Sequence, residues 1–263
     1  NRLDLEGYLV GALTSETDPK WPLEALEAHA VVSRTMAAHR VWISKDKPFD
    51  MTADTSTHLY HGVNAERQRT REAVQQTRGQ VLAYAGELVS ATFHANCGGH
   101  TEDAAELWQE KREIPPLTGR ADPYCRGLRH FRWEMKLPVR ELERKLNEAE
   151  SDPGQLQALE ILERNRSGRV RQIRLVGSRG EAILTGRKLR ELLGANRLRS
   201  LNFTAAISGD TIIFQGFGWG HGVGFCQWGA YGAARKGKKA EEILRHYFPG
   251  TQQRRLQGLP GFS

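Results

Sequence analysis

The spacing of apolar residues predicts a chain that mixes helices with short paired strands. Near the N-terminus apolar residues recur every three or four positions, which is typical of one face of a helix, and two helices joined by a loop are expected there. Further along, alternating apolar and polar positions predict strand pairs, one of them a hairpin that turns at Ala85-Gly86. The expected helices are 3–14, 22–40, 64–77, 139–149, 155–164, 186–193 and 240–247, and the expected strands are 81–84, 87–93, 170–176, 181–184, 201–207 and 211–215.

These elements predict an α+β fold of mixed helices and short antiparallel strands, divided into a core and a smaller inserted lobe. Residues 126–200 are more charged and poorer in glycine than the segments on either side, so we assign them to an inserted α/β lobe. Residues 1–125 and 201–263 then form the core, and a cleft is expected between core and lobe. The two candidate site segments lie near opposite ends of the chain, so the fold must bring these ends together.

Composition narrows the range of partners. The chain has 263 residues, a formal net charge of +7 and 39% hydrophobic residues, with no apolar run long enough to span a membrane. Its isoelectric point of about 9.5 favours an acidic partner. Basic residues between 136 and 174 alternate with glutamates, as on a solvated helix surface, so nucleic acid is not the expected partner. No export signal is visible, since the chain opens at Asn1 without an apolar segment.

The run 216–232 resembles no ordinary helix or strand, because seven of its seventeen residues are glycines. So many glycines imply a backbone that turns repeatedly or is approached closely. Its side chains offer stacking faces and hydrogen-bonding groups of the kind that grip a sugar ring. These side chains are Trp219, His221, Gln227 and Trp228. The alternative is a tightly folded structural loop around a buried indole.

Glu16 is the candidate general acid. We expect it in the loop between the first two helices, beside Trp21 and two prolines. A carboxyl with apolar neighbours can stay protonated near neutral pH and so can donate a proton. The alternative is a solvated loop carboxylate or a helix cap.

Four unusual segments occur in one order along the chain. They are 16–35, which follows the pattern Glu-x-Pro-x-x-Trp-Pro-x-Glu-Ala-Leu-x-Ala-Gln-Ala-Val-x-x-Arg-Thr; 54–62, an Asp-Thr stretch that ends in Tyr-x-Gly; 73–82 with 93–102; and the glycine-rich run with 243–251. Together they resemble the stage II sporulation protein D family, which includes the amidase enhancers. The match spans most of the chain.

The resemblance implies a peptidoglycan lytic transglycosylase, a carbon–oxygen lyase, with Glu16 as its acid and base. Cleavage of a β-1,4 glycosidic bond requires a proton on the leaving oxygen. In this reaction the sugar's own C6 hydroxyl closes onto C1 and leaves a 1,6-anhydro-N-acetylmuramoyl end, so one glutamate can donate and then accept the proton. The implied substrate contacts are Trp21, Asp54, Thr55, His58, Tyr60, Gly98, Gly99, Thr101, Trp219, His221, Gln227 and Trp228.

The chain departs from the family pattern at several positions. The usual Met-Pro after the glutamate is replaced by Thr-Asp-Pro, so Pro19 arrives one place late. Two glutamines of the pattern are His29 and His58 here, which changes any amide contact at these positions. Some family members bind zinc through His and Cys near the second segment, but residues 50–62 contain no cysteine and that site is not carried over. Glu102, like Asp54, is assigned to orienting hydrogen bonds or sugar contacts.

The three cysteines, Cys97, Cys125 and Cys226, leave two interpretations open. In an oxidising compartment the simplest is a Cys97–Cys125 disulfide with the third cysteine buried. The alternative is a structural zinc ion on all three thiolates. The expected reaction itself requires no cofactor.

The expected partner is the peptidoglycan glycan strand, stripped of its peptides so that its lactyl carboxylates form a line of negative charge for a basic cleft. The resemblance places the protein outside the cytoplasmic membrane, in the periplasm or cell wall, with an amidase as a second partner. Two other functions stay open. One is a non-catalytic wall-binding amidase enhancer, and the other is an assembly protein that docks through its basic surface.

Overall fold

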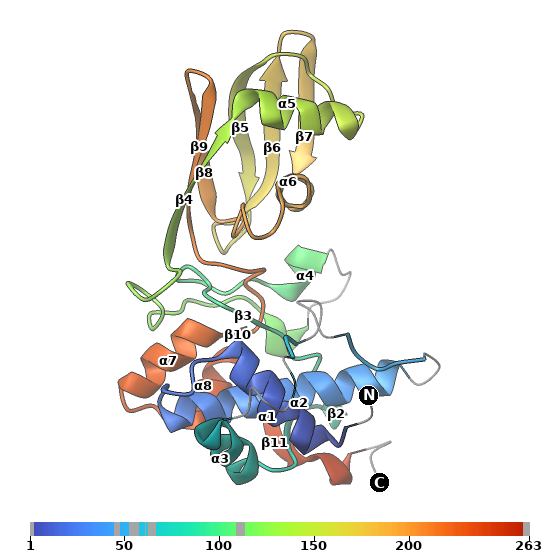
Figure 1. Cartoon of the computed structure of the whole chain (residues 1–263), viewed down its shortest axis with the longest axis vertical. Helices are drawn as coiled ribbons and strands as arrows, with labels where there is room; N and C mark the ends of the chain where they lie inside the picture. Colours follow the sequence, from blue (N-terminus) through green and yellow to red (C-terminus); the bar gives the residue numbers. More distant parts are fainter. Residues whose placement is uncertain are drawn as a thin grey trace. The chain divides into compact units, whose positions relative to one another are not determined.

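The computed structural model describes residues 3–44, 48–52, 58–60, 62, 67–108 and 114–259 (Figure 1). Helices occur together with short antiparallel sheets, which confirms the predicted α+β class. Over these described ranges, no helix is both long and apolar enough to cross a membrane.

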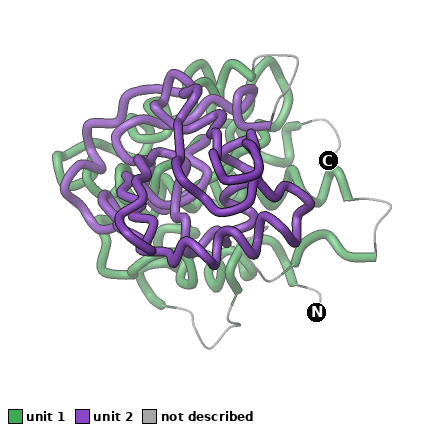
Figure 2. Tube along the Cα trace, turned by 90° about the horizontal axis from the view of Figure 1, so that it is seen from above, with its two compact units in different colours: residues 1–93, 112–118, 224–263 green, residues 94–111, 119–223 purple. Residues whose placement is uncertain are grey.

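The chain forms two compact units, coloured separately in Figure 2. Unit 1 comprises residues 1–93, 112–118 and 224–263, and unit 2 comprises residues 94–111 and 119–223. The lobe expected at 126–200 falls within the residues of unit 2.

Helix α2 (Leu23–Ile43) is the centre of unit 1 and contacts α1 (Leu5–Glu16), α3 (Gln68–Gln76), α7 (Gln227–Arg235) and α8 (Ala240–Tyr247) (Figure 1). Small residues on α2 let its neighbours approach closely, and the packed apolar surface removed from water stabilises the unit. The buried core comprises Leu9, Val10, Leu13, Trp21, Ala25, Leu26, Ala30, Ala73 and Val74.

A small antiparallel sheet completes unit 1, with β1 (Gln80–Tyr84) between β11 (Gln252–Arg255) and β2 (Glu87–Leu88). Ala85 and Gly86 both have positive φ, 51° and 87°, as a two-residue hairpin turn requires. The predicted hairpin is confirmed, although β2 is shorter than expected. The other short elements of unit 1 are η2 (Pro115–Leu117), β10 (Phe225–Cys226) and η3 (Leu256–Gly258). Strand β3 (Phe93–His94), which pairs with β10, includes the last residue of this segment of unit 1 and the first residue of unit 2.

Unit 2 contains two three-stranded antiparallel sheets, with strand orders β4-β9-β8 and β5-β6-β7. Its elements are α4 (Ala104–Trp108), β4 (Arg132–Pro138), α5 (Val139–Glu148), β5 (Leu156–Arg164), β6 (Val170–Gly177), β7 (Gly180–Thr185), α6 (Gly186–Leu193), β8 (Phe203–Ser208) and β9 (Thr211–Phe217). Buried side chains from both sheets and from the helices α5 and α6 form one core, with Leu142, Ile173 and Phe214 fully buried.

One sequence-based assignment in unit 2 is wrong, and one strand was missed. Residues 155–164 form the strand β5 and not a helix. The pairing of β5 with β6 shifts register three times, so its apolar residues depart from strict alternation and imitate helical spacing. Strand β4 was not predicted, although Trp133, Met135 and Leu137 alternate with charged residues as strand positions do.

Candidate active site

Glu16 is the last residue of α1 and not a loop residue, which corrects the sequence-based placement. The helix ends there because Thr17 turns to an extended conformation while its N–H and its hydroxyl both donate to Leu13 O, at 3.0 and 2.7 Å. Glu16 is therefore carried by the end of a helix whose preceding turns pack in the core of unit 1.

The backbone N–H of Leu59 donates to Glu16 Oε1 at 2.7 Å. A hydrogen bond from an N–H to a carboxylate is charge-assisted, and it fixes the orientation of the carboxyl group. Sequence analysis missed Leu59, because a backbone donor leaves no trace in side-chain identity. It follows His58 directly in the second family segment.

The residues on either side of Leu59 are held against α1. His58 Nδ1 and the Tyr8 hydroxyl share a hydrogen bond of 3.0 Å. The ring of Tyr60 stacks on the ring of Tyr8, with centroids 5.3 Å apart. Gly11 makes room for this stacking, since a Cβ there would lie 2.5 Å from Tyr60 Cε2.

Burial determines the protonation of this group. It raises the pKa of Tyr8 to about 12, with the charges of Glu16 and Tyr60 adding to the effect. It lowers the pKa of His58 to about 3. Near neutral pH both side chains are therefore uncharged.

Gln227 comes from the other end of the chain. It is the first residue of α7, and its Nε2 donates to the backbone oxygen of Glu16 at 3.3 Å. Within unit 1 the fold therefore brings Gln227 of the glycine-rich run to Glu16, while Trp219 and His221 of the same run belong to unit 2. The Cys226 side chain caps the same helix by accepting from Gly229 N.

An aromatic cluster lies in the same unit. The rings of Trp21 and Trp228 are 5.0 Å apart, and both pack against Tyr231, which sequence analysis missed. Trp21 is only 6% exposed, so most of its surface packs inside the unit. Asp54 and Thr55, two predicted substrate contacts, lie outside the described residues.

The other predicted contacts belong to unit 2. Trp219 exchanges backbone hydrogen bonds with Asn96, and Arg199 lies over its indole with Cζ 4.6 Å from the ring centroid. His221 Nδ1 accepts from Val223 N. The Thr101 hydroxyl accepts from Arg120 N at 2.9 Å.

The glycines of the run 216–232 accommodate the protein's own atoms. Gly218 has φ of 82°, and a Cβ there would lie 2.6 Å from Asn96 O. At Gly222, with φ of 92°, a Cβ would lie 2.2 Å from Arg169 Nη2. The close approach predicted from the glycine content is thus made, at these positions, by neighbouring chain within unit 2.

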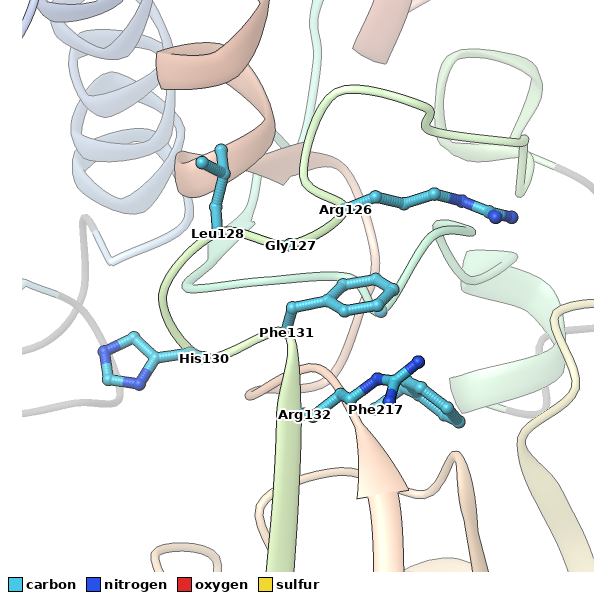
Figure 3. A pocket seen from close by; sticks show the side chains of 8 residues that line it. Arg126, Gly127, Leu128, His130, Phe131, Arg132 and Phe217 are labelled. Carbon is cyan, nitrogen blue, oxygen red and sulfur yellow. The ribbon is translucent and has the colours of Figure 1, made fainter.

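A cavity of about 810 Å³ in unit 2 combines arginines with aromatic rings. Figure 3 shows Arg126 and Arg132 extending to the same side as the Phe131 ring, with His130 pointing to the other side. Arg132 lies over the ring of Phe217, 5.5 Å from its centroid. One predicted contact, Gly98, belongs to this cavity. The cavity is lined by Gly98, Arg126, Gly127, Leu128, His130, Phe131, Arg132 and Phe217.

Glu102 is 2% exposed and is held inside unit 2. Its carboxylate accepts from the Ser167 hydroxyl at 2.9 Å and from its neighbour Asp103 N at 2.8 Å. The bond to Ser167 fastens the loop at 165–167 to Glu102, and the assignment of Glu102 to orienting hydrogen bonds or sugar contacts stays a prediction.

The predicted Cys97–Cys125 disulfide is absent. Cys97 and Cys125 are not joined by a disulfide, since their sulfurs lie 3.4 Å apart, against about 2.05 Å for a disulfide bond. Cys97 Sγ also lies 3.2 Å from Asp122 Oδ2, a carboxylate that sequence analysis missed although it stands three residues before Cys125. Cys226 belongs to unit 1, so a zinc ion on all three thiolates stays a prediction.

Comparison with known proteins gives two family models and several relatives. The model described as "Stage II sporulation protein" matches residues 1–84, and a "Domain of unknown function (DUF8618)" matches residues 108–224. An uncharacterized protein of Brachyspira hyodysenteriae is 35% identical over 95% of this chain and 67% of its own length. The stage II sporulation protein D of Bacillus amyloliquefaciens is 29% identical over 95% of this chain and 74% of its own length. The amidase enhancer of Bacillus subtilis is 25% identical over 92% of this chain and 40% of its own length. With the family model, the relatives and the ordered sequence segments in agreement, this chain belongs to the stage II sporulation protein D family.

Proposed function

We propose that this protein is a peptidoglycan lytic transglycosylase in which Glu16 is the single acid and base. The observation that carries the proposal is the Glu16 carboxyl, held by Leu59 N–H at 2.7 Å at the end of a packed helix. The relatives named stage II sporulation protein D and amidase enhancer support the coarser conclusion of a function at the cell wall. An extracytoplasmic location and an amidase partner are part of the proposal.

In the proposed reaction the Glu16 carboxyl, whose Oε1 accepts from Leu59 N–H, delivers its proton to the glycosidic oxygen between N-acetylmuramic acid and N-acetylglucosamine. As the bond breaks, positive charge develops at C1 and the C6 hydroxyl attacks it. The resulting carboxylate then takes the C6 proton, which restores the acid for the next cycle.

The substrate is a glycan strand that carries carboxylates, preferably one stripped of its peptides. Removing the peptides exposes the lactyl carboxylate of each muramic acid. Arg126 and Arg132 of the unit 2 cavity offer guanidinium groups that suit a carboxylate, next to a Phe131 ring that suits a sugar face. The net charge of +7 favours the same partner.

The deciding experiment incubates peptide-free and peptide-bearing strands with the wild type and with Glu16→Gln, and analyses the products by mass spectrometry. We expect 1,6-anhydro ends from the wild type, more from peptide-free strands, and a rate at least about 100-fold lower from the variant, because the amide keeps the shape but cannot donate a proton. Glu27→Gln is the matched control. It changes a partly buried carboxyl on α2 in the same unit and should leave the rate unchanged.

Two results would contradict the proposal. Products ending in a water-derived hydroxyl would indicate a hydrolase, which needs a second catalytic group. Intact strands from a folded wild type, together with stimulation of an amidase that Glu16→Gln does not alter, would establish the wall-binding enhancer instead.

A further inference from the structure

Three potential metal ligands meet in the interior of unit 2. The Sγ atoms of Cys97 and Cys125 and a carboxylate oxygen of Asp122 lie close enough to bind one ion. All three residues are fully buried, with 0% of their surface exposed. Two thiols and a carboxyl group sealed from water are costly unless they are paired, hydrogen-bonded or bound to a metal.

The distances between these donors suit a tetrahedral zinc ion. Zinc binds thiolates at about 2.3 Å and carboxylates at about 2.0–2.2 Å, which places two sulfurs about 3.8 Å apart and a sulfur and an oxygen about 3.5 Å apart. The corresponding separations are 3.4 Å between Cys97 and Cys125, and 3.2 Å between Cys97 Sγ and Asp122 Oδ2. Outward shifts of a few tenths of an ångström are enough to admit the ion.

Hydrogen bonds around the cluster fix the donors in place. Asp122 Oδ1 accepts from Tyr124 N at 2.8 Å, while Asp122 N donates to Gly99 O at 2.9 Å. These two bonds leave Oδ2 turned toward Cys97. Such outer contacts orient metal ligands and are part of a metal site's design.

The charge of the surroundings also favours a metal complex. Arg169 is 1% exposed, and its guanidinium donates to the backbone oxygens of Cys97 and His100 at 2.8 and 3.0 Å. A buried guanidinium is stabilised by negative charge close to it. Two thiolates and a carboxylate exceed the charge of Zn²⁺ by one, and this excess balances the buried arginine.

We propose that Cys97, Asp122 and Cys125 hold one structural zinc ion that fastens residues 97–99 to residues 122–125. Thiolate ligands in a buried site select zinc over calcium or magnesium. This function does not depend on glycan cleavage. It differs from the zinc site of some family members, which lies at the second sequence segment.

The test measures metal content in the whole purified chain by inductively coupled plasma mass spectrometry. We expect one zinc per wild-type chain, and less than about a tenth of that in Cys97→Ser with Cys125→Ser and in Asp122→Asn. Asp152→Asn is the matched control, because Asp152 Oδ1 also accepts a backbone N–H two residues on, from Gly154, outside the cluster. It should keep its zinc, and a chelator should lower the melting temperature of the wild type and of this control but not of the double cysteine variant.

X-ray absorption of the wild-type zinc keeps the proposal testable if a variant fails to fold. Two or three sulfur ligands per zinc support it, and three are expected if Cys226 is the further thiolate predicted from the sequence. A zinc ion without sulfur ligands overturns it, as does full zinc in the double cysteine variant. The wild type could instead contain no zinc and resist alkylation of Cys97 and Cys125 until it is reduced. This result would indicate a disulfide and would also overturn the zinc proposal.

Discussion

His29 and His58 stand where the family pattern has glutamine, and both are fully buried. Their rings pack against Phe93, at 4.8 and 5.5 Å between centroids. Within the part of the chain that the structure describes, His58 Nε2 and both ring nitrogens of His29 have no hydrogen-bond partner. Burial lowers the pKa of each imidazole from its ordinary value of 6.5 to about 3.

Stability should therefore fall in acid. The unfolded chain binds protons at these histidines below pH 6.5, while the folded chain binds them only near pH 3, so the stabilisation is complete above pH 6.5 and is lost as the pH falls toward 3. Each histidine contributes a slope of up to about 1.4 kcal/mol per pH unit. Urea unfolding of the wild type and of His58→Gln between pH 4.5 and pH 7.5 measures this slope of the unfolding free energy against pH.

His58→Gln should reduce that slope by roughly the share of one histidine, and His29→Gln with His58→Gln by that of two. The glutamine side chain cannot titrate in this range, and it restores the residue of the family pattern. An unchanged slope in the double variant would mean that neither imidazole is held neutral by burial.

The residue types in the sequence motifs predicted only part of the candidate site. The motifs pointed to Glu16, His58, Tyr60 and Gln227, and unit 1 places these residues together, while their roles stay predictions. Leu59 acts through its backbone N–H, and Tyr8 through its place on the face of α1, so neither type nor spacing identified them. Such contacts are decided by tertiary packing.

A buried ion pair joins the elements of unit 1. Arg34 of α2 donates through Nε and Nη2 to both carboxylate oxygens of Glu6 in α1, at 2.9 and 2.8 Å. The same guanidinium donates to the backbone oxygens of Val74 and Gln80, at the ends of α3 and the start of β1. One fully buried side chain therefore fixes the mutual positions of several elements that carry the candidate site.

Glu6→Gln should destabilise the protein strongly. The substitution leaves Arg34 buried without its counter-charge, a situation that costs about 3–5 kcal/mol. Glu241→Gln is the matched control, because Glu241 pairs with Arg245 on the exposed surface of α8 and should change stability by less than about 0.5 kcal/mol. Urea unfolding measures both, and equal effects of the two substitutions would contradict the structural role of the buried pair.

Elements were predictable where spacing and end signals agreed. The helix at 186–193 ends at Gly194, whose φ of 90° suits a glycine stop, and the turn at Ala85-Gly86 has the chemistry of a hairpin. β5 was mistaken for a helix because Leu156 and Leu159 stand three residues apart, as on one face of a helix. A register shift between Leu156 and Ala158 lets a strand pack both residues against the core, and only the pairing with β6 reveals this shift. A local pattern of apolar residues does not show which strands pair with one another in the fold.

At the scale of the whole molecule, the net charge of +7 attracts any polyanion, so charge alone does not select a glycan strand. Selection requires groups that recognise a carboxylate beside a sugar ring. The cavity with Arg126, Phe131 and Arg132 combines the two kinds of group in unit 2. Its contribution can be separated from the general charge by comparing arginines inside and outside the cavity.

Arg126→Ala and Arg132→Ala should each weaken binding of peptide-free strands by about 3- to 10-fold, the size of one carboxylate contact that is partly screened by solvent. Arg144→Ala is the matched control, because the substitution removes the same charge at an exposed arginine of unit 2 that pairs with Glu148 outside the cavity. Calorimetric titration at low and at physiological salt measures the affinities, with chitin oligosaccharides as ligands that lack the lactyl carboxylate. If the cavity recognises this carboxylate, its two variants lose affinity for the strands and bind chitin oligosaccharides as the wild type does. An equal loss in all three variants would mean that the strand responds only to the overall charge.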